Sequence, residues 1–181
     1  MSLVAWMIVA CEIAFWCVIL LGLVVRYVFK KDKLGYFLLC LVPVIDLALL
    51  IFAGYDLLSG AVSTKAHGIA AVYIGVSLAF GKSMIQWADE RFQYYIMKQG
   101  PAPVKRYGLD YAKHYLKGWL KHVLAYLIGA GLLAALIYFI QDPARTESLS
   151  AILKLWSVVL GIDLIITVTY FLFPKTEKAK S

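Results

Sequence analysis

The stretch that decides the fold is HGIAAVYIGVSLAFGKSMIQWADERFQYYIMKQ, from His67 to Gln99. Its first two thirds are apolar enough to cross a bilayer, and its last third changes abruptly to charged and aromatic residues. Small residues occupy every fourth position of the apolar part, at Ala71, Gly75, Ala79 and Ser83. Such a seam lets a neighbouring helix approach closely, so we expect this helix to lie at the centre of a helix-packing interface.

The composition of the chain is that of an integral membrane protein. Of its 181 residues, 62% are hydrophobic and 16% are charged, and the mean hydropathy is +0.79. Soluble domains have nearly half apolar residues and about a quarter charged residues. The net charge of +7 does not indicate nucleic-acid binding, because the basic residues border apolar runs, where they act as topology signals and contact anionic lipid.

Four further apolar runs accompany the central one, which predicts an all-α polytopic membrane protein with a bundle of five transmembrane helices. The expected spans cover residues 3–28, 34–55, 67–90, 122–140 and 149–173. Pro43 lies inside the second of these, where it removes a backbone donor and is expected to kink the helix. Residues 1–174 would then form a single transmembrane domain, followed by a short polar cytoplasmic tail at 175–181.

The distribution of basic residues predicts the orientation. With the N-terminus outside and the C-terminus inside, the inner side receives Arg26, Lys30, Lys31, Lys33, Arg91, Lys98, Lys105, Arg106, Lys113, Lys117, Lys121, Lys175, Lys178 and Lys180. The outer side receives only Lys65, Arg145 and Lys154. This asymmetry follows the positive-inside rule, and it predicts a multi-pass protein with its N-terminus outside and its C-terminus inside.

The segment before the fourth span is predicted to be a basic amphipathic helix. Its apolar positions from Leu109 onward follow helical spacing, and Lys113, Lys117 and Lys121 recur every four residues on another face. We expect this segment, with Trp119, to lie along the cytoplasmic interface and to contact anionic lipid before the chain turns into the fourth span.

Four ionisable residues are expected inside the bilayer, at Glu12, Asp46, Lys82 and Asp163. Each costs about 2.5 to 3.5 kcal/mol at mid-helix, so such residues normally face the bundle interior and find partners. The rise of the helix would allow all four to meet in one layer. Thr167 and Tyr170 follow Asp163 at spacings of four and seven residues and extend a polar stripe along the last span.

Three interpretations of these charges remain open. The acids could form a proton or cation pathway with Lys82 as countercharge. They could instead form a buried structural network in which Lys82 pairs with one acid and the others are protonated. Finally, Lys82 could extend toward the interface near Gln86 and Asp89 without meeting the acids.

The sequence predicts no catalytic residue, no metal site and no cofactor. It contains no Ser/His/Asp, HExxH, P-loop or GxGxxG pattern. His114 and His122 are eight positions apart on the basic segment, which is too far to share a metal ion. We expect His67, at the outer mouth of its span, to cap a helix or to lie at the interface.

Several fragments together resemble a family of small bacterial integral membrane proteins, the YmcC type. They are CEIAFW at 11–16, PVIDLALL at 43–50, HGIAAVYIGVSLAFGKSMIQWADERF at 67–92 and YG at 107–108. The resemblance runs from the first span to the end of the third and is weaker afterwards. It implies a bacterial cytoplasmic-membrane protein, and it carries no catalytic or binding residues over to this chain.

We therefore expect a structural or regulatory membrane subunit, not an enzyme, whose partners are the phospholipid bilayer, anionic lipid at the cytoplasmic face, and a membrane-protein partner or a second copy of the chain. The first alternative is a proton- or cation-coupled transporter or channel that uses the intramembrane acids. The second is a membrane-embedded enzyme with a lipid-accessible cavity lined by those acids.

Overall fold

The computed structural model describes residues 3–95, 97–98, 101–102 and 104–175, except for the side chains of residues 3–5, 8, 9, 11, 12, 43 and 46. Over these residues the chain forms six α-helices and no β-strand. The helices are α1 (Leu3–Tyr27), α2 (Asp32–Cys40), α3 (Val42–Leu58), α4 (Lys65–Tyr95), α5 (Gly108–Ile140) and α6 (Glu147–Leu172). The prediction of an all-helical fold is confirmed for this part of the chain.

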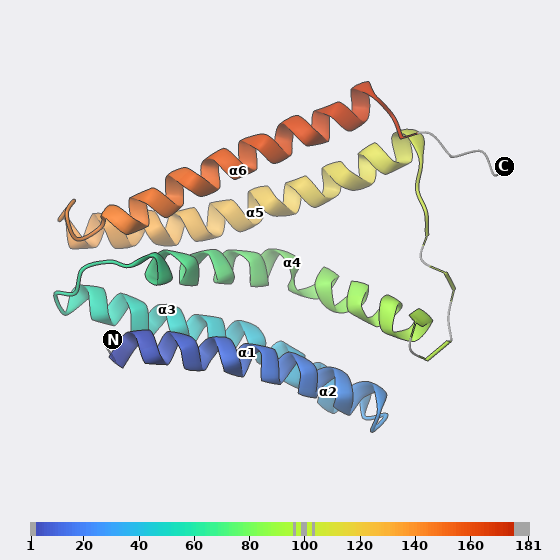
Figure 1. Ribbon diagram of the computed structural model, residues 1–181, viewed down its shortest axis with the longest axis horizontal. Helices are drawn as coiled ribbons and strands as arrows, with labels where there is room; N and C mark the ends of the chain where they lie inside the picture. The colour runs from blue at the N-terminus through green and yellow to red at the C-terminus, as the bar shows by residue number, and fades with distance from the viewer. Residues whose placement is uncertain (1–2, 96, 99–100, 103, 176–181) are drawn as a thin grey trace.

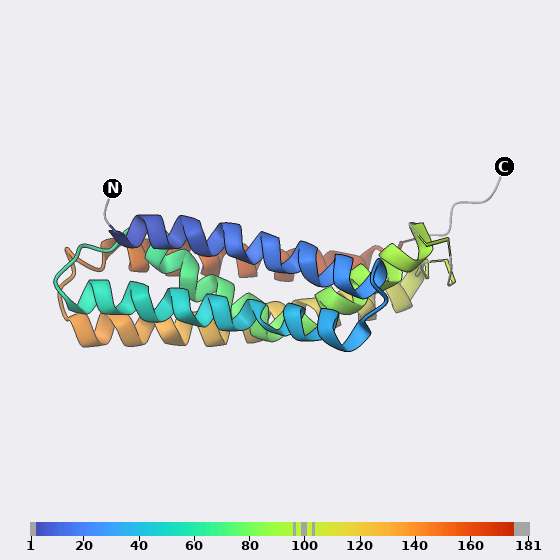
Figure 2. The same cartoon turned by 90° about the horizontal axis from the view of Figure 1, so that it is seen from below.

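The helices form an elongated bundle with α4 in its middle. Figure 1 shows α1 and α3 on one side of α4 and the α5–α6 pair on the other, and α4 packs against α3, α5 and α6. In the view turned by 90°, the long helices all run along the same axis (Figure 2). Helix α4 is therefore the element that joins the two halves of the bundle.

The connections between helices gather at two ends of the bundle. The α1–α2 turn, the C-terminal end of α4, the start of α5 and the end of α6 share one end (Figure 1). There the backbone N–H of Gly108 donates to the carbonyl of Lys175 at 2.8 Å. We call this the basic end, because the lysines and arginines of residues 26–33 and 104–117 lie there. The α3–α4 and α5–α6 connections form the opposite end.

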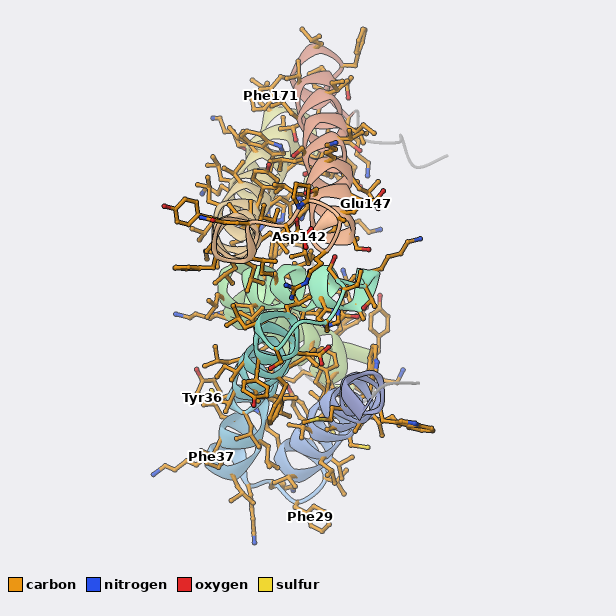
Figure 3. All side chains as sticks on the ribbon, turned by 90° about the vertical axis from the view of Figure 1, so that its left-hand side faces the viewer. Phe29, Tyr36, Phe37, Asp142, Glu147 and Phe171 are labelled. Carbon is orange, nitrogen blue, oxygen red and sulfur yellow. The ribbon has the colours of Figure 1, made fainter. Side chains whose placement is uncertain are left out.

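Three helices in the described part of the chain are long and apolar enough to cross a membrane, namely α4, α5 and α6. Helices α1 and α3 contribute shorter apolar stretches, Ile13–Tyr27 and Leu47–Leu58. Large apolar side chains point outward around the bundle, and Phe29, Tyr36 and Phe37 are labelled examples in Figure 3. A surface of this kind is stable only when lipid or another apolar surface covers it.

The predicted second span is divided into two helices, α2 and α3, which differs from a single kinked helix over 34–55. The break falls at Leu41, two residues before Pro43, which occupies the first turn of α3. Proline has no N–H to donate to the carbonyl four residues earlier, and its ring disfavours helical backbone just before it. The amides of Val44 and Ile45 instead both donate to the carbonyl of Leu41, at 3.0 and 3.1 Å, and restart the helix.

The sequence predicts a separate interfacial helix before the fourth span, and this prediction is wrong. The basic amphipathic segment forms the first turns of α5, which continues for 33 residues without a break. The sequence between Lys117 and Val123 contains one glycine and no proline, so nothing forces the helix to end there. This region is also joined to α6, because the indole N–H of Trp119 donates to the carbonyl of Leu160 at 3.4 Å.

Candidate functional site

The small-residue seam of α4 lies against α5. A Cβ atom added to Gly75 would overlap with the carbonyl oxygen of Ala125, and one added to Gly129 would lie 2.9 Å from the carbonyl oxygen of Ala71. The two backbones therefore touch where Ala71 and Gly75 face Ala125 and Gly129. Further along the seam, Ala79 and Ser83 are only half-buried. The close contact is thus confined to the half of the seam nearer the opposite end.

Asp163 is bound by side chains of α5. Its Oδ2 lies 2.5 Å from Nδ1 of His122, and its Oδ1 accepts a hydrogen bond from the hydroxyl of Tyr115 at 3.3 Å. The Asp163 side chain is 16% exposed and that of His122 is 50% exposed. The ring of Phe80, from α4, packs 4.8 Å from the imidazole. A carboxylate on an apolar helix thus has two polar partners on the neighbouring helix.

The polar stripe that begins at Asp163 continues toward the basic end as a group of tyrosines. The hydroxyl of Thr167 is buried and donates to the carbonyl of Asp163 at 2.7 Å, within its own helix. Tyr170 packs its ring against Tyr111 at 4.9 Å and against Tyr115 at 4.7 Å. The α5–α6 contact is therefore polar and aromatic over its half near the basic end.

The remaining predicted charges are not brought together with Asp163 by any contact in the described residues. Lys82 is exposed on α4. Glu12 lies on α1 and Asp46 on α3, but their side chains fall outside the described part of the structure. Asp163 instead contacts Tyr115 and His122, which the sequence places on the basic segment. Aspartate and histidine 41 residues apart carry no local pattern that could have revealed this pair.

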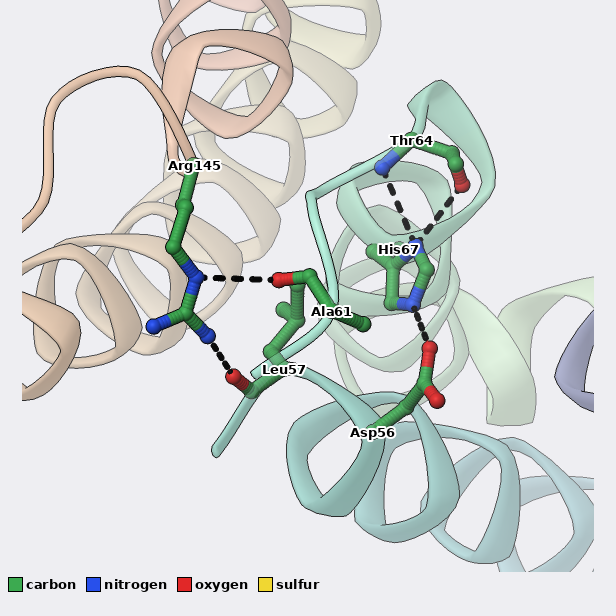
Figure 4. A network of polar contacts seen from close by, with 6 residues as sticks. All are labelled: Asp56, Leu57, Ala61, Thr64, His67 and Arg145. Carbon is green, nitrogen blue, oxygen red and sulfur yellow. Dashed lines mark hydrogen bonds and ion pairs between the residues drawn. The ribbon is translucent and has the colours of Figure 1, made fainter. Parts of the chain in front are cut away.

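A polar network closes the opposite end of the bundle (Figure 4). Nδ1 of His67 accepts the backbone N–H of Thr64 at 3.2 Å and lies 2.7 Å from its hydroxyl, while Nε2 lies 3.3 Å from a carboxylate oxygen of Asp56. Because Nδ1 accepts an N–H, the ring proton is on Nε2 and points at Asp56. His67 thus caps the start of α4 in the manner of the third residue of a capping box.

Arg145 extends this network to the α5–α6 connection. Its guanidinium donates to the carbonyls of Leu57 and Ala61 (Figure 4). Its own backbone carbonyl accepts a hydrogen bond from the N–H of Ser63 at 2.8 Å. Carbonyls at the end of α3 would otherwise lack donors, because a helix cannot satisfy its own last turn. The arginine therefore joins the two connections into one closed end.

At the basic end, an ion pair joins α1 to α4. Nη1 of Arg26 lies 2.8 Å from a carboxylate oxygen of Asp89, and the hydroxyl of Tyr27 donates to the other oxygen. The ring of Tyr27 also stacks on Phe92 with 4.0 Å between centroids. This contact fixes the end of α1 on the part of α4 that extends past its apolar run.

A cleft of about 610 Å³ lies over the start of α5. The preceding chain contributes Val104, Lys105, Arg106 and Tyr107, and the first turns of α5 contribute Asp110, Lys113, His114 and Lys117. Four permanent cations thus face one carboxylate, and the helix N-terminus adds positive potential. Partial burial, and after it the charges of Arg106, Lys117 and Lys121, lower the pKa of His114 below its ordinary value. The arrangement can attract and hold an anion.

The other predicted interface residues lie outside this cleft. Lys121 is half-buried one turn beyond Lys117. Trp119 is half-buried between α5 and α6, where it makes the hydrogen bond to Leu160. Within the residues whose side chains are described, no cluster of three or more His, Cys, Asp or Glu side chains could hold a metal ion.

Comparison with known proteins identifies the family. The chain is 66% identical to a protein of Bacillus subtilis (strain 168) described as "Uncharacterized membrane protein YmcC". The match covers all 181 residues of the chain and 98% of that relative. The chain belongs to the YmcC family. No family model matches it, and no solved structure matches it. Membership in the YmcC family and the three long apolar helices together place the chain in a membrane.

Proposed function

We propose that the chain crosses the bacterial cytoplasmic membrane five times and acts there as a structural or regulatory subunit, not as an enzyme. It binds anionic lipid at the inner face or another membrane protein through its apolar faces. The N-terminus lies outside and the C-terminus inside. The observation that carries this proposal is the length and charge of α5.

Helix α5 is longer than a bilayer core. Its 33 residues correspond to about 50 Å, against roughly 30 Å of hydrocarbon. If the apolar residues from about His122 onward fill the core, the turns that carry Lys113 and Lys117 lie at the level of the lipid phosphates. Cations at that level attract anionic lipid, by about 1 kcal/mol each.

The arrangement of the helix ends supports five crossings. Helices α1, α4, α5 and α6, and α2 and α3 together as one broken span, each run between the basic end and the opposite end. The basic end carries most of the lysines and arginines, and the positive-inside rule assigns such an end to the cytoplasm.

Labelling of single cysteines tests this orientation. In a variant without Cys11, Cys17 and Cys40, we expect a membrane-impermeant maleimide to label Ser59→Cys in intact cells. Lys105→Cys should be labelled only after the membrane is permeabilised. Labelling of both positions from the same side would contradict the crossing of α4, and the reverse pattern would contradict the orientation.

Extraction in polymer discs without detergent tests the functional proposal. We expect the discs to be enriched in anionic phospholipid relative to the bulk membrane, or to contain a second membrane protein in a fixed ratio. The enrichment in lipid should fall in a triple variant with Lys113, Lys117 and Lys121 each replaced by Gln. Discs with bulk lipid composition and only single copies of the chain would overturn the proposal.

A second candidate function is proton- or cation-coupled transport, which the contact of Asp163 with His122 and Tyr115 favours. Titratable groups in contact on apolar helices can accept and release protons. Proteoliposomes loaded with a pH-sensitive dye provide the test. Equal leak for wild type and for Asp46→Asn combined with Asp163→Asn would exclude this function.

A further inference from the structure

We propose that the cleft over the first turns of α5 binds the phosphate of an anionic glycerophospholipid, whose acyl chains follow an exposed apolar stripe on the same helix. This inference rests on the lipid binding proposed above and names its site and ligand. The chemistry that the site recognises is a phosphate ester with a net negative charge.

The polar half of the site is the cleft itself. Lys105 and Arg106 approach from the preceding chain, and Lys113 and Lys117 approach from one face of α5. Cations therefore surround the space from two segments, instead of forming a single row on one helix face. A guanidinium and several ammonium groups supply the donors that phosphate oxygens accept. The volume of about 610 Å³ is large enough for a phosphate headgroup, and the cleft is open on one side.

The apolar half of the site continues directly from the cleft. Leu120, Leu124 and Leu127 follow Lys113 and Lys117 at spacings of three and four residues, so all five share one face of α5. These leucines are 54%, 48% and 63% exposed. A charged cleft that leads onto an exposed apolar stripe matches a molecule with a phosphate at one end and hydrocarbon at the other.

This continuity favours a lipid over a soluble phosphate ester. A free phosphate would use the cations and leave the leucine stripe uncovered. Asp110 also lies in the cleft and opposes a small, highly charged anion, whereas a phosphodiester carries a single negative charge. Phosphatidylglycerol, a phosphodiester with an uncharged glycerol headgroup, is the probe that fits this chemistry.

The test compares lysines inside and outside the cleft. Purified protein is titrated with phosphatidylglycerol or with phosphatidylcholine of the same acyl chains, and bound lipid is counted by native mass spectrometry. We expect wild type to prefer phosphatidylglycerol by about tenfold or more, and Lys113→Gln or Lys117→Gln to reduce its affinity roughly fivefold each. Lys121→Gln removes the same charge one turn from Lys117 but outside the cleft, and should change the affinity less than about twofold.

The outcomes separate this inference from the function on which it rests. Equal losses in the three lysine variants would overturn the cleft and leave a diffuse attraction for anionic lipid, which still agrees with the proposed function. Absence of any preference for phosphatidylglycerol in wild type would overturn the cleft and the binding of anionic lipid together, and would leave only a protein partner for the proposed function. Inorganic phosphate and glycerophosphoglycerol, which lacks acyl chains, serve as competitors. Displacement of the lipid by either at equal concentration would assign the cleft to a soluble phosphate compound and overturn the lipid site.

Discussion

Asp163 of α6 and His122 of α5 lie with Oδ2 and Nδ1 2.5 Å apart, where the polar half of the α5–α6 contact begins. The same carboxylate accepts a hydrogen bond from the hydroxyl of Tyr115. Together with the bonds from Trp119 to Leu160 and between Tyr126 and Ser157, this cluster joins α5 to α6 along several turns.

Replacement of Asp163 by Asn should loosen the α5–α6 pair. The asparagine amide is neutral and has one acceptor oxygen, so it cannot accept hydrogen bonds from both His122 and Tyr115 as the two carboxylate oxygens do. We therefore expect a loss of about 1 to 3 kcal/mol in the free energy of unfolding. The measurement is thermal or denaturant unfolding in detergent micelles. In a double-mutant cycle with His122→Gln, the two losses should not add, because both changes break the same contact. Additive losses would contradict a direct interaction, and Lys154→Gln on the same helix is the neutral control.

Two glycines of α4 provide a matched test of the α4–α5 contact. Gly75→Ala inserts a methyl group against the carbonyl of Ala125 and should destabilise the protein by about 1 to 3 kcal/mol. Gly81→Ala meets nothing within 4 Å and should be neutral or stabilising, by up to about 1 kcal/mol, since alanine favours the helix. Unfolding curves of the two variants give the comparison. Tolerance of alanine at Gly75 would show that the two helices lie further apart.

The closed end of the bundle should open when Arg145 is replaced by Gln. The shorter amide cannot reach the carbonyls of both Leu57 and Ala61, so the end of α3 and the connection at residues 59–64 lose their side-chain bonds to the α5–α6 turn. The backbone bond from Ser63 to the carbonyl of residue 145 remains. We expect faster amide hydrogen exchange in that connection and little change in the middle of α4. Lys65→Gln, next to the same connection, is the control for loss of charge. Unchanged exchange in the Arg145 variant would show that its side chain does not hold the connection, which would then depend on the contacts of His67 and on the backbone bond of Ser63.

Binding of anionic lipid should strengthen as the pH falls. Partial burial and the charges of Arg106, Lys117 and Lys121 lower the pKa of His114, and Asp110 is the acidic group that shares its cleft. A bound phosphate favours protonated His114 and raises its pKa. The extra affinity is therefore fully present below the pKa of the free protein and is lost as the pH rises through the pKa of the lipid-bound protein.

The measurement is the affinity for phosphatidylglycerol between about pH 8 and pH 5, the range in which histidine titrates. His114→Gln should flatten the dependence, whereas His122→Gln, which lies outside the cleft, should leave it in place. A wild-type affinity that stays constant over this range would contradict a role for His114 at the phosphate.

Much of the fold follows from the sequence, because the length of an apolar run and the length of a helix are both set by the thickness of the bilayer core. The helical class could be predicted for that reason, and the four-residue spacing from Ala71 to Gly75 is visible without coordinates. The division at Leu41 could not be fixed, since Pro43 permits either a kink or a break, and contacts around it decide. The continuity of α5 was also missed, because a change from basic to apolar composition does not by itself end a helix.

The site was less accessible to sequence reasoning. Asp163 stood out as a costly charge, but its partner His122 is 41 residues away and had been assigned to a different environment. The cleft combines Lys105 and Arg106, from an irregular segment, with residues of α5, and no periodicity relates the two. Only the three-dimensional path of the chain brings these groups to one place.

The contact of Gly75 with Ala125 also bears on how the protein is assembled. Two backbones in close contact attract each other by van der Waals packing, and this attraction does not depend on ionic strength. The α5–α6 hairpin should therefore join the first four helices equally well in dilute and concentrated salt. The ion pair between Arg26 and Asp89 joins α1 to α4 and would weaken as ionic strength rises. High salt should thus loosen the contact between α1 and α4 and leave the contact between α4 and α5 intact.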